Sequence, residues 1–399
     1  MDMAEEVSSL EEGLAEILSE DEFNTMEDLW SMLTGGYVDG SMSAEEIYAI
    51  NLDDYIDFLP EKDEEGNYLL TNLKDFTLFT GMVNGGYTQI NAKLLADINL
   101  SVNEDQTESE NPNLMIGVED SPFRGTFDGQ GHTITYSYDL VNNYGGLFSY
   151  INNATIKNLR VEGDVITRGI HFGALIGYGD GTMHIENVIT DVDITGEHSG
   201  VTGNGGMIGA LYGNITFTNC ATLGTMGYPG SSMYCGFVAF ATSGVSSTLN
   251  NCYTACTLTE GTGTDYCFTF CRGTCRLNNC YYLNAIGDTQ GTQMTLTQFQ
   301  SGEVCYKLNA PQQELVWYQT INTDDYPVLS PDCEQVFFNA EEGYYYNLIN
   351  GVPVGINEIS ADVNVNTNFG EGIYNLAGQR LSKMQKGINI VNKKKVLVK

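Results

Sequence analysis

Positive charge is scarce in this sequence of 399 residues, which has 17 Lys and Arg against 52 Asp and Glu and a formal net charge of −35. Such an acidic chain repels phosphate backbones and anionic lipid surfaces, so we expect no nucleic-acid partner. Long hydrophobic runs are also missing. No stretch of about 18 apolar residues occurs, so we expect no membrane-spanning helix. The apolar content of 42% still suffices for a folded core, which argues against global disorder.

Catalytic motifs are scarce as well. The four histidines form no His-Glu-x-x-His motif, which argues against a zinc peptidase in this chain. No Gly-x-Ser-x-Gly elbow occurs, and the glycine-rich segment 125–134 lacks the lysine of a phosphate-binding loop. The sequence therefore names no catalytic residue.

The two ends of the chain differ in charge. The first residues, MDMAEEVSSLEEGL, carry acid where a signal peptide carries basic residues, and no apolar stretch follows. The segment 372–399 contains seven Lys and Arg and no acid. This is typical of a separately used segment, although a solvated tail held by the acidic body explains the same pattern. Export of the protein would need a signal peptide upstream of Met1.

Helices are predicted mainly near the N-terminus. Residues 1–60 form an acidic region in which Ser9 with Glu12 is a capping box, and similar starts follow at residues 25 and 43. Another helix is predicted after Thr71 and Asn72. Its apolar side consists of Leu73, Phe76, Phe79 and Met82.

From about residue 88 the sequence contains an internal repeat. Five stretches each end a strand-like run at an asparagine, with spacings of 29, 32, 32 and 28 residues: Asn158, Asn187, Asn219, Asn251 and Asn279. A second column of apolar segments runs ahead of them, beginning at Gly145, Phe172, Gly205, Cys235 and Cys267. Two sequence patterns that recur with the same period are typical of a solenoid, in which each strand-turn-strand unit stacks on the next.

The repeat also predicts which side chains point inward. Counted from each asparagine, odd offsets should face the interior and even offsets the exterior, because side chains alternate along a strand. The odd positions are mostly apolar or small, among them Leu159, Val188, Cys220 and Cys252. We expect the repeated asparagines to hydrogen-bond along the stack. The predicted fold class is therefore all-β, a parallel β-helix or solenoid.

Three segments carry a family resemblance: GTFDGQGHTI (125–134), YGGLFSY (144–150) and ATIKNLRVEGDV (154–165). Together they resemble the GLUG-repeat domains of bacterial surface proteins, and residues 73–101 resemble the lead-in of such domains. The resemblance covers about residues 73–283 and implies a right-handed parallel β-helix. Similar repeats accompany adhesin-like proteins and the non-catalytic part of immunoglobulin A peptidases.

The basic segment 372–399 resembles the C-terminal sorting domains of Bacteroidota proteins exported by the type IX route. That resemblance implies a small β appendage and a location at the cell surface or outside the cell. Between it and the solenoid, residues 294–309 are predicted to form one helix with Thr295 and Gln298 as its capping box. This helix and two short strands near residues 317 and 327 are expected to cap the solenoid. The predicted regions are 1–60 (helical), 61–293 (β-helix), 294–359 (cap), 360–371 (linker) and 372–399 (tail).

All ten cysteines lie between Cys220 and Cys333. Their gaps do not match the paired spacing of structural zinc sites, and no histidine lies nearby. We interpret Cys220, Cys252 and Cys280 as small buried hydrophobes of one inward column. One or two disulfides between stacked coils are the alternative.

Two sets of outward residues are candidate binding sites. Offsets four and six place four carboxylates on one outer face: Glu162, Asp164, Asp191 and Asp193. Three interpretations of these carboxylates are open. They could bind a Ca²⁺ ion that relieves the repulsion among them, or act as the acid and base of a glycosidase. They could also form a solvated acidic face without a specific role. Tyr253 and Tyr281 share the outward offset two and would present flat faces to a glycan or a protein, or simply stiffen the sheet.

We predict an exported, monomeric, cell-surface protein that acts without catalysis as a stalk or adhesin-like binder. Its ligand would be a glycan or a surface protein bound on the lateral face of the β-helix, with no cofactor except the Ca²⁺ considered above. The alternative is a carbohydrate-active enzyme, a lyase or glycoside hydrolase, that uses carboxylates on the same face. That alternative rests on fold analogy.

Overall fold

A computed structural model describes residues 59–101, 114–141, 143–197, 203–227, 233–260, 265–349 and 351–354, together with the backbone of four strands after residue 372. The helices expected in residues 1–60 lie almost wholly outside these described residues. The chain divides into two compact units, Met1–Ile356 and Asn357–Lys399, and each is described by itself. Among the described residues, no helix has the length and apolar character needed to cross a membrane.

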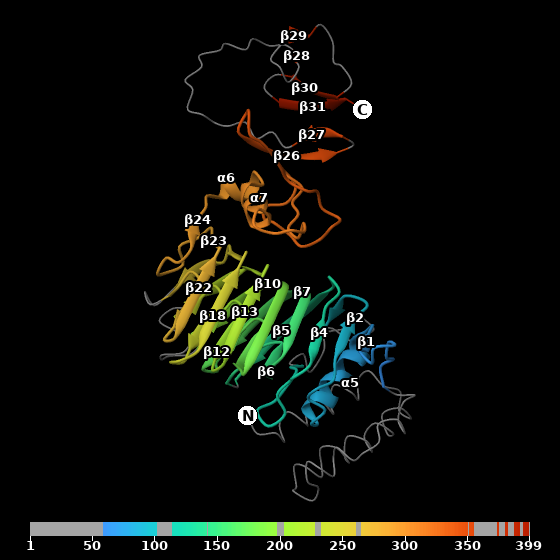
Figure 1. Ribbon diagram of the computed structural model, residues 1–399, viewed down its shortest axis with the longest axis vertical. Coiled ribbons are helices and arrows are strands. Elements are labelled where there is room, and N and C mark those ends of the chain that lie inside the picture. The colour runs from blue at the N-terminus through green and yellow to red at the C-terminus, as the bar shows by residue number, and fades with distance from the viewer. Residues whose placement is uncertain are drawn as a thin grey trace, which may run out of the picture. The chain divides into compact units, whose positions relative to one another are not determined.

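The first unit is the expected solenoid, an all-β parallel stack of about five turns (Figure 1). Its largest sheet has 16 strands, and all the pairings between them are parallel. The path through that sheet is β1 (Tyr68–Leu70), β2 (Ala92–Leu94), β4 (Thr126–Asp128), β7 (Thr155–Thr167), β10 (Thr182–Gly196), β14 (Ala221–Leu223), β19 (Tyr253–Thr254), β23 (Tyr281–Tyr282) and β24 (Thr292–Gln293). Its remaining strands are β3 (Ile98–Asn99), β5 (Thr133–Leu140), β13 (Asn214–Thr218), β15 (Thr225–Gly227), β18 (Ser246–Asn250), β20 (Thr257–Glu260) and β22 (Thr274–Asn278).

Two smaller parallel sheets complete the wall of the solenoid. The three-stranded sheet contains β8 (His171–Gly173), β11 (Gly203–Gly205) and β16 (Met233–Cys235). The five-stranded sheet contains β6 (Phe148–Asn152), β9 (Ile176–Asp180), β12 (Ile208–Leu211), β17 (Val238–Ala241) and β21 (Thr269–Cys271). These strands come from the second column of the repeat, so both columns of the sequence pattern become stacks of strands.

The interior follows the predicted alternation. Leu159 pairs with Val188 in the next coil, and both are buried. Cys220, Cys252 and Cys280 continue the same buried column. They belong to one hydrophobic core that runs through the stack. Core formation by the odd offsets is therefore confirmed.

The repeated asparagines form one corner of the solenoid. All five have left-handed backbone, with φ between 52° and 54°, a region that asparagine tolerates better than most residues. Their side chains bond from coil to coil: Asn187 Nδ2 donates to Asn158 Oδ1 over 3.0 Å, and Asn219 Nδ2 donates to Asn187 Oδ1 over 3.1 Å. Asn279 donates to Asn251 in the same way over 3.0 Å. The predicted asparagine ladder is confirmed for these pairs.

Helix α5 (Leu73–Asn84) covers the start of the solenoid and begins where the sequence predicted. The side chain of Asn72 accepts a hydrogen bond from the backbone N–H of Asp75, which is an N-cap. The predicted apolar side of α5 is buried against the core, with Phe76 and Phe79 fully enclosed.

The cap differs from the prediction in two ways. Residues 294–309 form two helices, α6 (Leu296–Gln300) and α7 (Glu303–Asn309), because Gly302 between them has φ +84° and ends the first helix. The capping box of Thr295 and Gln298 is present. The cap also packs beside the coils on outward-facing residues, and with them it builds a second hydrophobic core.

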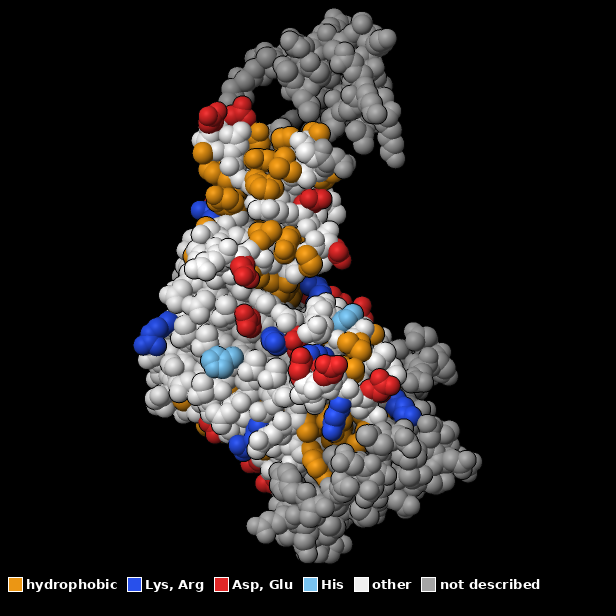
Figure 2. Space-filling model, turned by 45° about the vertical axis from the view of Figure 1, so that its right-hand side comes forward, with side chains coloured by type: hydrophobic (Ala, Val, Ile, Leu, Met, Phe, Trp, Pro, Cys, Tyr) orange, Lys and Arg blue, Asp and Glu red, His pale blue; other side chains and the backbone are white. Residues whose placement is uncertain are grey.

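Two small antiparallel sheets follow. Strands β25 (Phe337–Asn339), β26 (Tyr344–Ile349) and β27 (Val352–Val354) form the first. Hydrophobic side chains gather at this end of the first unit (Figure 2). Leu348 on β26 and Val352 on β27 are exposed. The second unit contains the expected β appendage, a four-stranded sheet of β28 (Ile373–Tyr374), β29 (Arg380–Leu381), β30 (Gly387–Val391) and β31 (Lys394–Val398).

Candidate functional sites on the wall of the solenoid

The residues two positions after each repeated asparagine form a column along the stack, and this column explains where the cap packs. Along consecutive coils, register places Arg160 beside Ile189, Ile189 beside Ala221, and Ala221 beside Tyr253. Ile189, Ala221 and Tyr253 point outward from the lumen, yet they are buried in the second core under the cap. Arg160 is the member of this column on the coil before Ile189, and it remains partly exposed beyond the cap.

The exposure expected for the tyrosine pair is therefore wrong for Tyr253. Its side chain has an exposed fraction of 0%, its ring packs against Phe299 and Trp317, and its hydroxyl donates to the carbonyl of Pro327 over 2.6 Å. Tyr281 is half-buried, and its hydroxyl donates to the Oδ1 of Asn279 over 2.6 Å. The ring of Tyr253 offers no face to a ligand because the cap covers it, and Tyr281 packs partly buried against the same core.

The four candidate carboxylates do stack as the repeat predicted. Asp191 pairs in register with Glu162, and Asp193 pairs with Asp164. Their side chains, however, bind different partners. Arg160 forms ion pairs with Glu162 and, over 2.8 Å, with Asp191.

The other two carboxylates bond to hydroxyls. Asp193 Oδ1 accepts from the backbone N–H and the hydroxyl of Thr225, each over 2.7 Å. Asp164 accepts from Ser137 over 2.9 Å. Among the residues that the structure describes, no group of three or more His, Cys, Asp or Glu side chains is placed to hold a metal ion. A Ca²⁺ site at these four residues thus has only their register in its favour.

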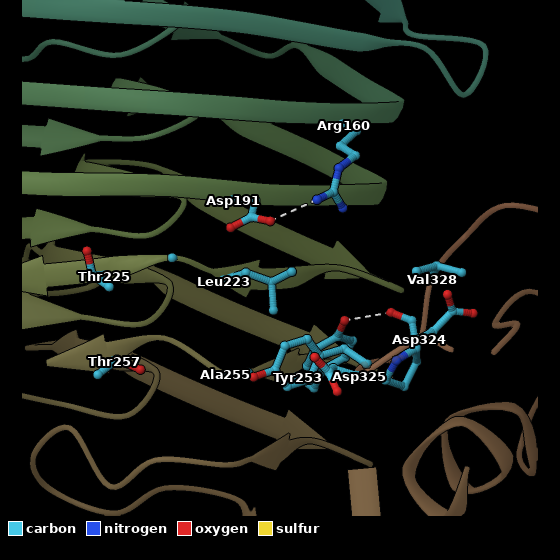
Figure 3. Close-up of a pocket in the computed structure, with 13 residues that line it drawn as sticks. Arg160, Asp191, Leu223, Thr225, Tyr253, Ala255, Thr257, Asp324, Asp325 and Val328 are labelled. Carbon is cyan, nitrogen blue, oxygen red and sulfur yellow. Dashed lines mark hydrogen bonds and ion pairs between the residues drawn. The ribbon is translucent and has the colours of Figure 1, made fainter. Parts of the chain in front are cut away.

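A groove of about 380 Å³ lies between this acidic face and the cap (Figure 3). Arg160 and Asp191 lie on the side formed by the solenoid, and Asp324 and Asp325 come from the facing loop of the cap. Burial raises the pKa of the Asp191 carboxyl above its usual range, against the opposing effect of the Arg160 guanidinium. The groove therefore contains one carboxyl that holds its proton more tightly than an exposed aspartate.

Most of the cysteines are buried, and none of the ten forms a disulfide. All ten are free thiols. Burial raises the pKa of Cys235 and Cys305 well above the usual range and that of Cys256 to about 11. The seven buried cysteines fill space as hydrophobes, and the alternative of disulfides between coils is absent from this structure.

A second pocket, of about 550 Å³, lies on the outer side of the five-stranded sheet and is lined by tyrosines. Tyr150 on β6 stands in register with Tyr178 on β9, and the ring of Tyr212 stacks on Tyr178 with centroids 4.8 Å apart and planes at 19°. Tyr144 closes one side, 5.7 Å from the Tyr150 ring and 5.3 Å from the Tyr178 ring. We call these four residues, Tyr144, Tyr150, Tyr178 and Tyr212, the tyrosine pocket.

Aromatic contacts continue beyond the tyrosine pocket. Phe240 lies 6.0 Å from Tyr212, and Phe270 lies 6.4 Å from Phe240. The guanidinium of Arg272 lies over both phenylalanine rings, 5.4 and 5.8 Å from their centroids. The result is a ladder of rings that crosses five successive coils.

Polar groups surround the tyrosine faces. Asn152 and Asp180 lie two residues after Tyr150 and Tyr178 and pair in register on the same two strands. Glu119, Asp120 and Arg124 complete the rim. Burial, with the charge of Asp180 and the neighbouring Tyr212 and Glu119, raises the pKa of the Tyr178 hydroxyl. Such a hydroxyl stays protonated and available as a hydrogen-bond donor at neutral pH.

The same environment acts on Tyr144. Burial raises the pKa of its hydroxyl, and the contact with Tyr212 adds to the effect. Tyr144 also has a left-handed backbone with φ 60°, which is uncommon for a bulky residue and is often found at functional sites. A side chain at Gly177 would bring a Cβ to within 1.8 Å of the Tyr144 carbonyl oxygen. The glycine therefore permits the close approach that holds Tyr144 over the pocket.

Sequence reasoning missed the tyrosine pocket. The notable positions, Tyr150, Tyr178, Tyr212, Phe240 and Phe270, recur at the repeat period, each near the end of a segment of the second column. That recurrence of aromatics was available in the sequence. Glu119 and Asp120 come from a connecting segment outside the repeat pattern, and Tyr144 directly precedes the second-column segment that begins at Gly145. Only folding brings these three residues to the pocket.

Comparison with known proteins gives one weak likeness. No family model matches the chain, and no curated protein matches it. A solved structure titled "putative immunoglobulin A1 protease" from Bacteroides ovatus is similar in fold, with 15% sequence identity and a TM-score of 0.45. The match covers 68% of this chain and 94% of that chain. A likeness this weak carries no argument about activity.

Proposed function

We propose that this protein is an exported, cell-surface, adhesin-like protein that binds a glycan in the tyrosine pocket. The observation that supports this best is the group of four tyrosine rings, two of them stacked, that line a pocket of about 550 Å³ with a polar rim. The solenoid supplies the stalk, and binding requires no cofactor. The resemblance of residues 372–399 to sorting domains supports export, and the resemblance of the repeats to GLUG domains supports a surface role.

A glycan suits this pocket because a sugar has apolar C–H faces and a polar edge. An aromatic ring offers a broad apolar face with low conformational freedom, and tyrosine adds a hydroxyl at its end. Tyr212 has an exposed fraction of 38% and Tyr178 is half-buried, so part of the stack faces solvent. Around the rings, Asn152, Asp180 and Glu119 offer acceptors for sugar hydroxyls. Binding sites commonly combine an aromatic floor with a few such polar groups.

The pocket is also rigid enough to be preorganised. Tyr150 and Tyr178 lie on adjacent parallel strands whose register is fixed, and Tyr150 is nearly buried with an exposed fraction of 7%. A ligand that binds there does not have to order these two side chains, which lowers the entropic cost of binding.

The test is glycan-array binding followed by titration of the best ligand against single variants. Tyr178→Ala and Tyr212→Ala should each weaken binding at least about tenfold, which corresponds to about 1.4 kcal/mol. Tyr306→Ala is the matched control, because Tyr306 lies on the cap with an exposed fraction of 37%, close to the 38% of Tyr212. Unchanged affinity in both pocket variants, or an equal loss in Tyr306→Ala, would reject the pocket as the glycan site.

The second candidate is a carbohydrate-active enzyme that works in the groove between the acidic face and the cap. The observation in its favour is Asp191, whose raised pKa suits a general acid. Reducing-sugar release from polysaccharides that is lost in Asp191→Asn and retained in Tyr178→Ala would replace the adhesin proposal with this one. No release from any polysaccharide tested would leave the groove without a catalytic role.

A further inference from the structure

We infer that the tyrosine pocket selects neutral glycans and rejects those that carry a carboxylate, and that Glu119, Asp120 and Asp180 make this selection. The inference rests on the proposed function and names the class of ligand for the same site. We call these three residues the acidic rim.

The charge of the pocket is unbalanced. Its lining contains three carboxylates and one guanidinium, that of Arg124. Arg124 donates to the amide oxygen of Asn152 over 3.3 Å. Among the described residues, no ion pair within 4.0 Å involves Arg124 or the acidic rim. The rim charges therefore remain uncompensated, in contrast to Glu162 and Asp191, which share Arg160.

The rim is fixed in place on both sides of the pocket. Glu119 and Asp120 lie in a tight turn in which the backbone groups of Val118 and Ser121 bond to each other in both directions, over 3.2 and 3.1 Å. Parallel bridges hold this turn at each end, Ile116 to Phe148 and Phe123 to Ile151. The backbone that carries these two carboxylates is therefore held at the edge of the pocket.

Asp180 is fixed from the opposite strand. It pairs in register with Asn152, and one of its carboxylate oxygens accepts from the backbone N–H of Gly181 over 2.7 Å. Gly181 has a left-handed backbone with φ 73°, and a Cβ there would lie 2.6 Å from the Asn153 side chain. The glycine allows the turn that keeps Asp180 at the edge of the pocket.

The rim lies close to the tyrosine hydroxyls that a sugar would contact. The charge of Glu119 contributes to the raised pKa of both Tyr144 and Tyr178, and the charge of Asp180 contributes to that of Tyr178. A carboxylate on a bound sugar would enter the same field. Like charges at short range repel, whereas the hydroxyls of a neutral sugar donate hydrogen bonds to carboxylates. A neutral glycan gains from the rim, and an anionic glycan is repelled by it.

The experiment uses an array in which each neutral oligosaccharide is paired with a counterpart that differs by one sialic or uronic acid carboxylate. The full chain should bind the neutral member at least about tenfold more tightly at low salt, and the ratio should shrink as ionic strength rises. In the variant Glu119→Gln, Asp120→Asn, Asp180→Asn, the ratio should fall to within about twofold of one. Binding of neutral glycans should change much less than the ratio does.

A matched control separates the rim from the overall charge. Glu186→Gln, Glu260→Gln, Glu341→Gln removes the same number of negative charges from exposed positions that do not line the pocket, and it should keep the tenfold ratio. Equal binding of both members by the full chain, or an equal fall of the ratio in the control, would overturn the inference and leave the proposed function intact. No binding of any glycan by the full chain would overturn both.

Discussion

Replacement of Asn187 by alanine should destabilise the solenoid more than any conservative change on its surface. Asn187 has φ 54° and sits in the middle of the asparagine ladder. It donates to Asn158 over 3.0 Å and accepts from Asn219 over 3.1 Å. The substitution therefore acts on the backbone and on two hydrogen bonds at once.

The expected magnitude is the sum of these two effects. Each ladder bond contributes about 1 kcal/mol net to stability. Holding alanine in the left-handed region costs about another 1 kcal/mol relative to asparagine. We expect Asn187→Ala to lower the free energy of unfolding by about 3 kcal/mol, which is a large share of the stability of a typical domain.

Two further variants separate the effects. Asn187→Gly restores backbone freedom without the side-chain bonds, so it should lose about 2 kcal/mol by the same accounting. Asn278→Ala removes one exposed bond of the adjacent column, to Asn250 over 2.8 Å, and should lose less than about 1 kcal/mol. Urea unfolding followed by circular dichroism gives all three values. The reasoning fails if Asn187→Gly is no more stable than Asn187→Ala, or if both behave like Asn278→Ala.

Three other predictions concern the cap, a histidine and the thiols. Tyr253→Phe removes the hydrogen bond to Pro327 and should lower the free energy of unfolding by about 1 kcal/mol, whereas Tyr253→Ala opens the second core and should lower it by about 3–5 kcal/mol. Urea unfolding followed by Trp317 fluorescence measures both values, and equal losses would contradict the packing described. Burial lowers the pKa of His171 from its ordinary value of 6.5. The neutral ring therefore contributes its full stability above that pH, and the contribution is lost as the pH falls further, through the lowered pKa of the folded state. The melting temperature of His171→Phe should be less sensitive to acid, and an unchanged sensitivity would contradict this. Iodoacetamide at neutral pH should modify the partly exposed Cys271, Cys275 and Cys333 before the seven buried cysteines. Mass spectrometry gives the order of modification, and the reverse order would contradict the burial pattern.

Much of the fold could be predicted because each coil repeats the same short sequence pattern, with the same backbone and burial requirements. Asn158, Asn187 and their equivalents mark a corner that needs left-handed backbone, and the alternation after each corner sorts core from surface. The start of α5 at Asn72 is a local hydrogen-bond pattern. None of these features depends on contacts far along the chain, so the sequence alone reveals them.

The cap and the sites could not be predicted in the same way. Tyr253 was expected to be exposed because the repeat places it on the outer face, and the repeat contains no information about residues 294–336 that cover it. The clue was that Ile189, Ala221 and Tyr253 are apolar at outward positions, where a solvated wall would carry polar residues. The tyrosine pocket was missed because Glu119 and Tyr144 reach it from connecting segments, whose course depends on the completed stack.

The cap that lies along Ile189, Ala221 and Tyr253 has a mechanical consequence. A force along the solenoid axis loads the backbone bonds between coils one coil at a time, as in unzipping. The cap packs on four consecutive coils, through these three residues and Tyr281, so a pull that separates any of those coils must also shear the cap from the wall. The coil that carries Arg160 has no such brace. Under tension, the chain should therefore unwind first from the coils nearer its N-terminus, while the braced coils act as a single stiff block.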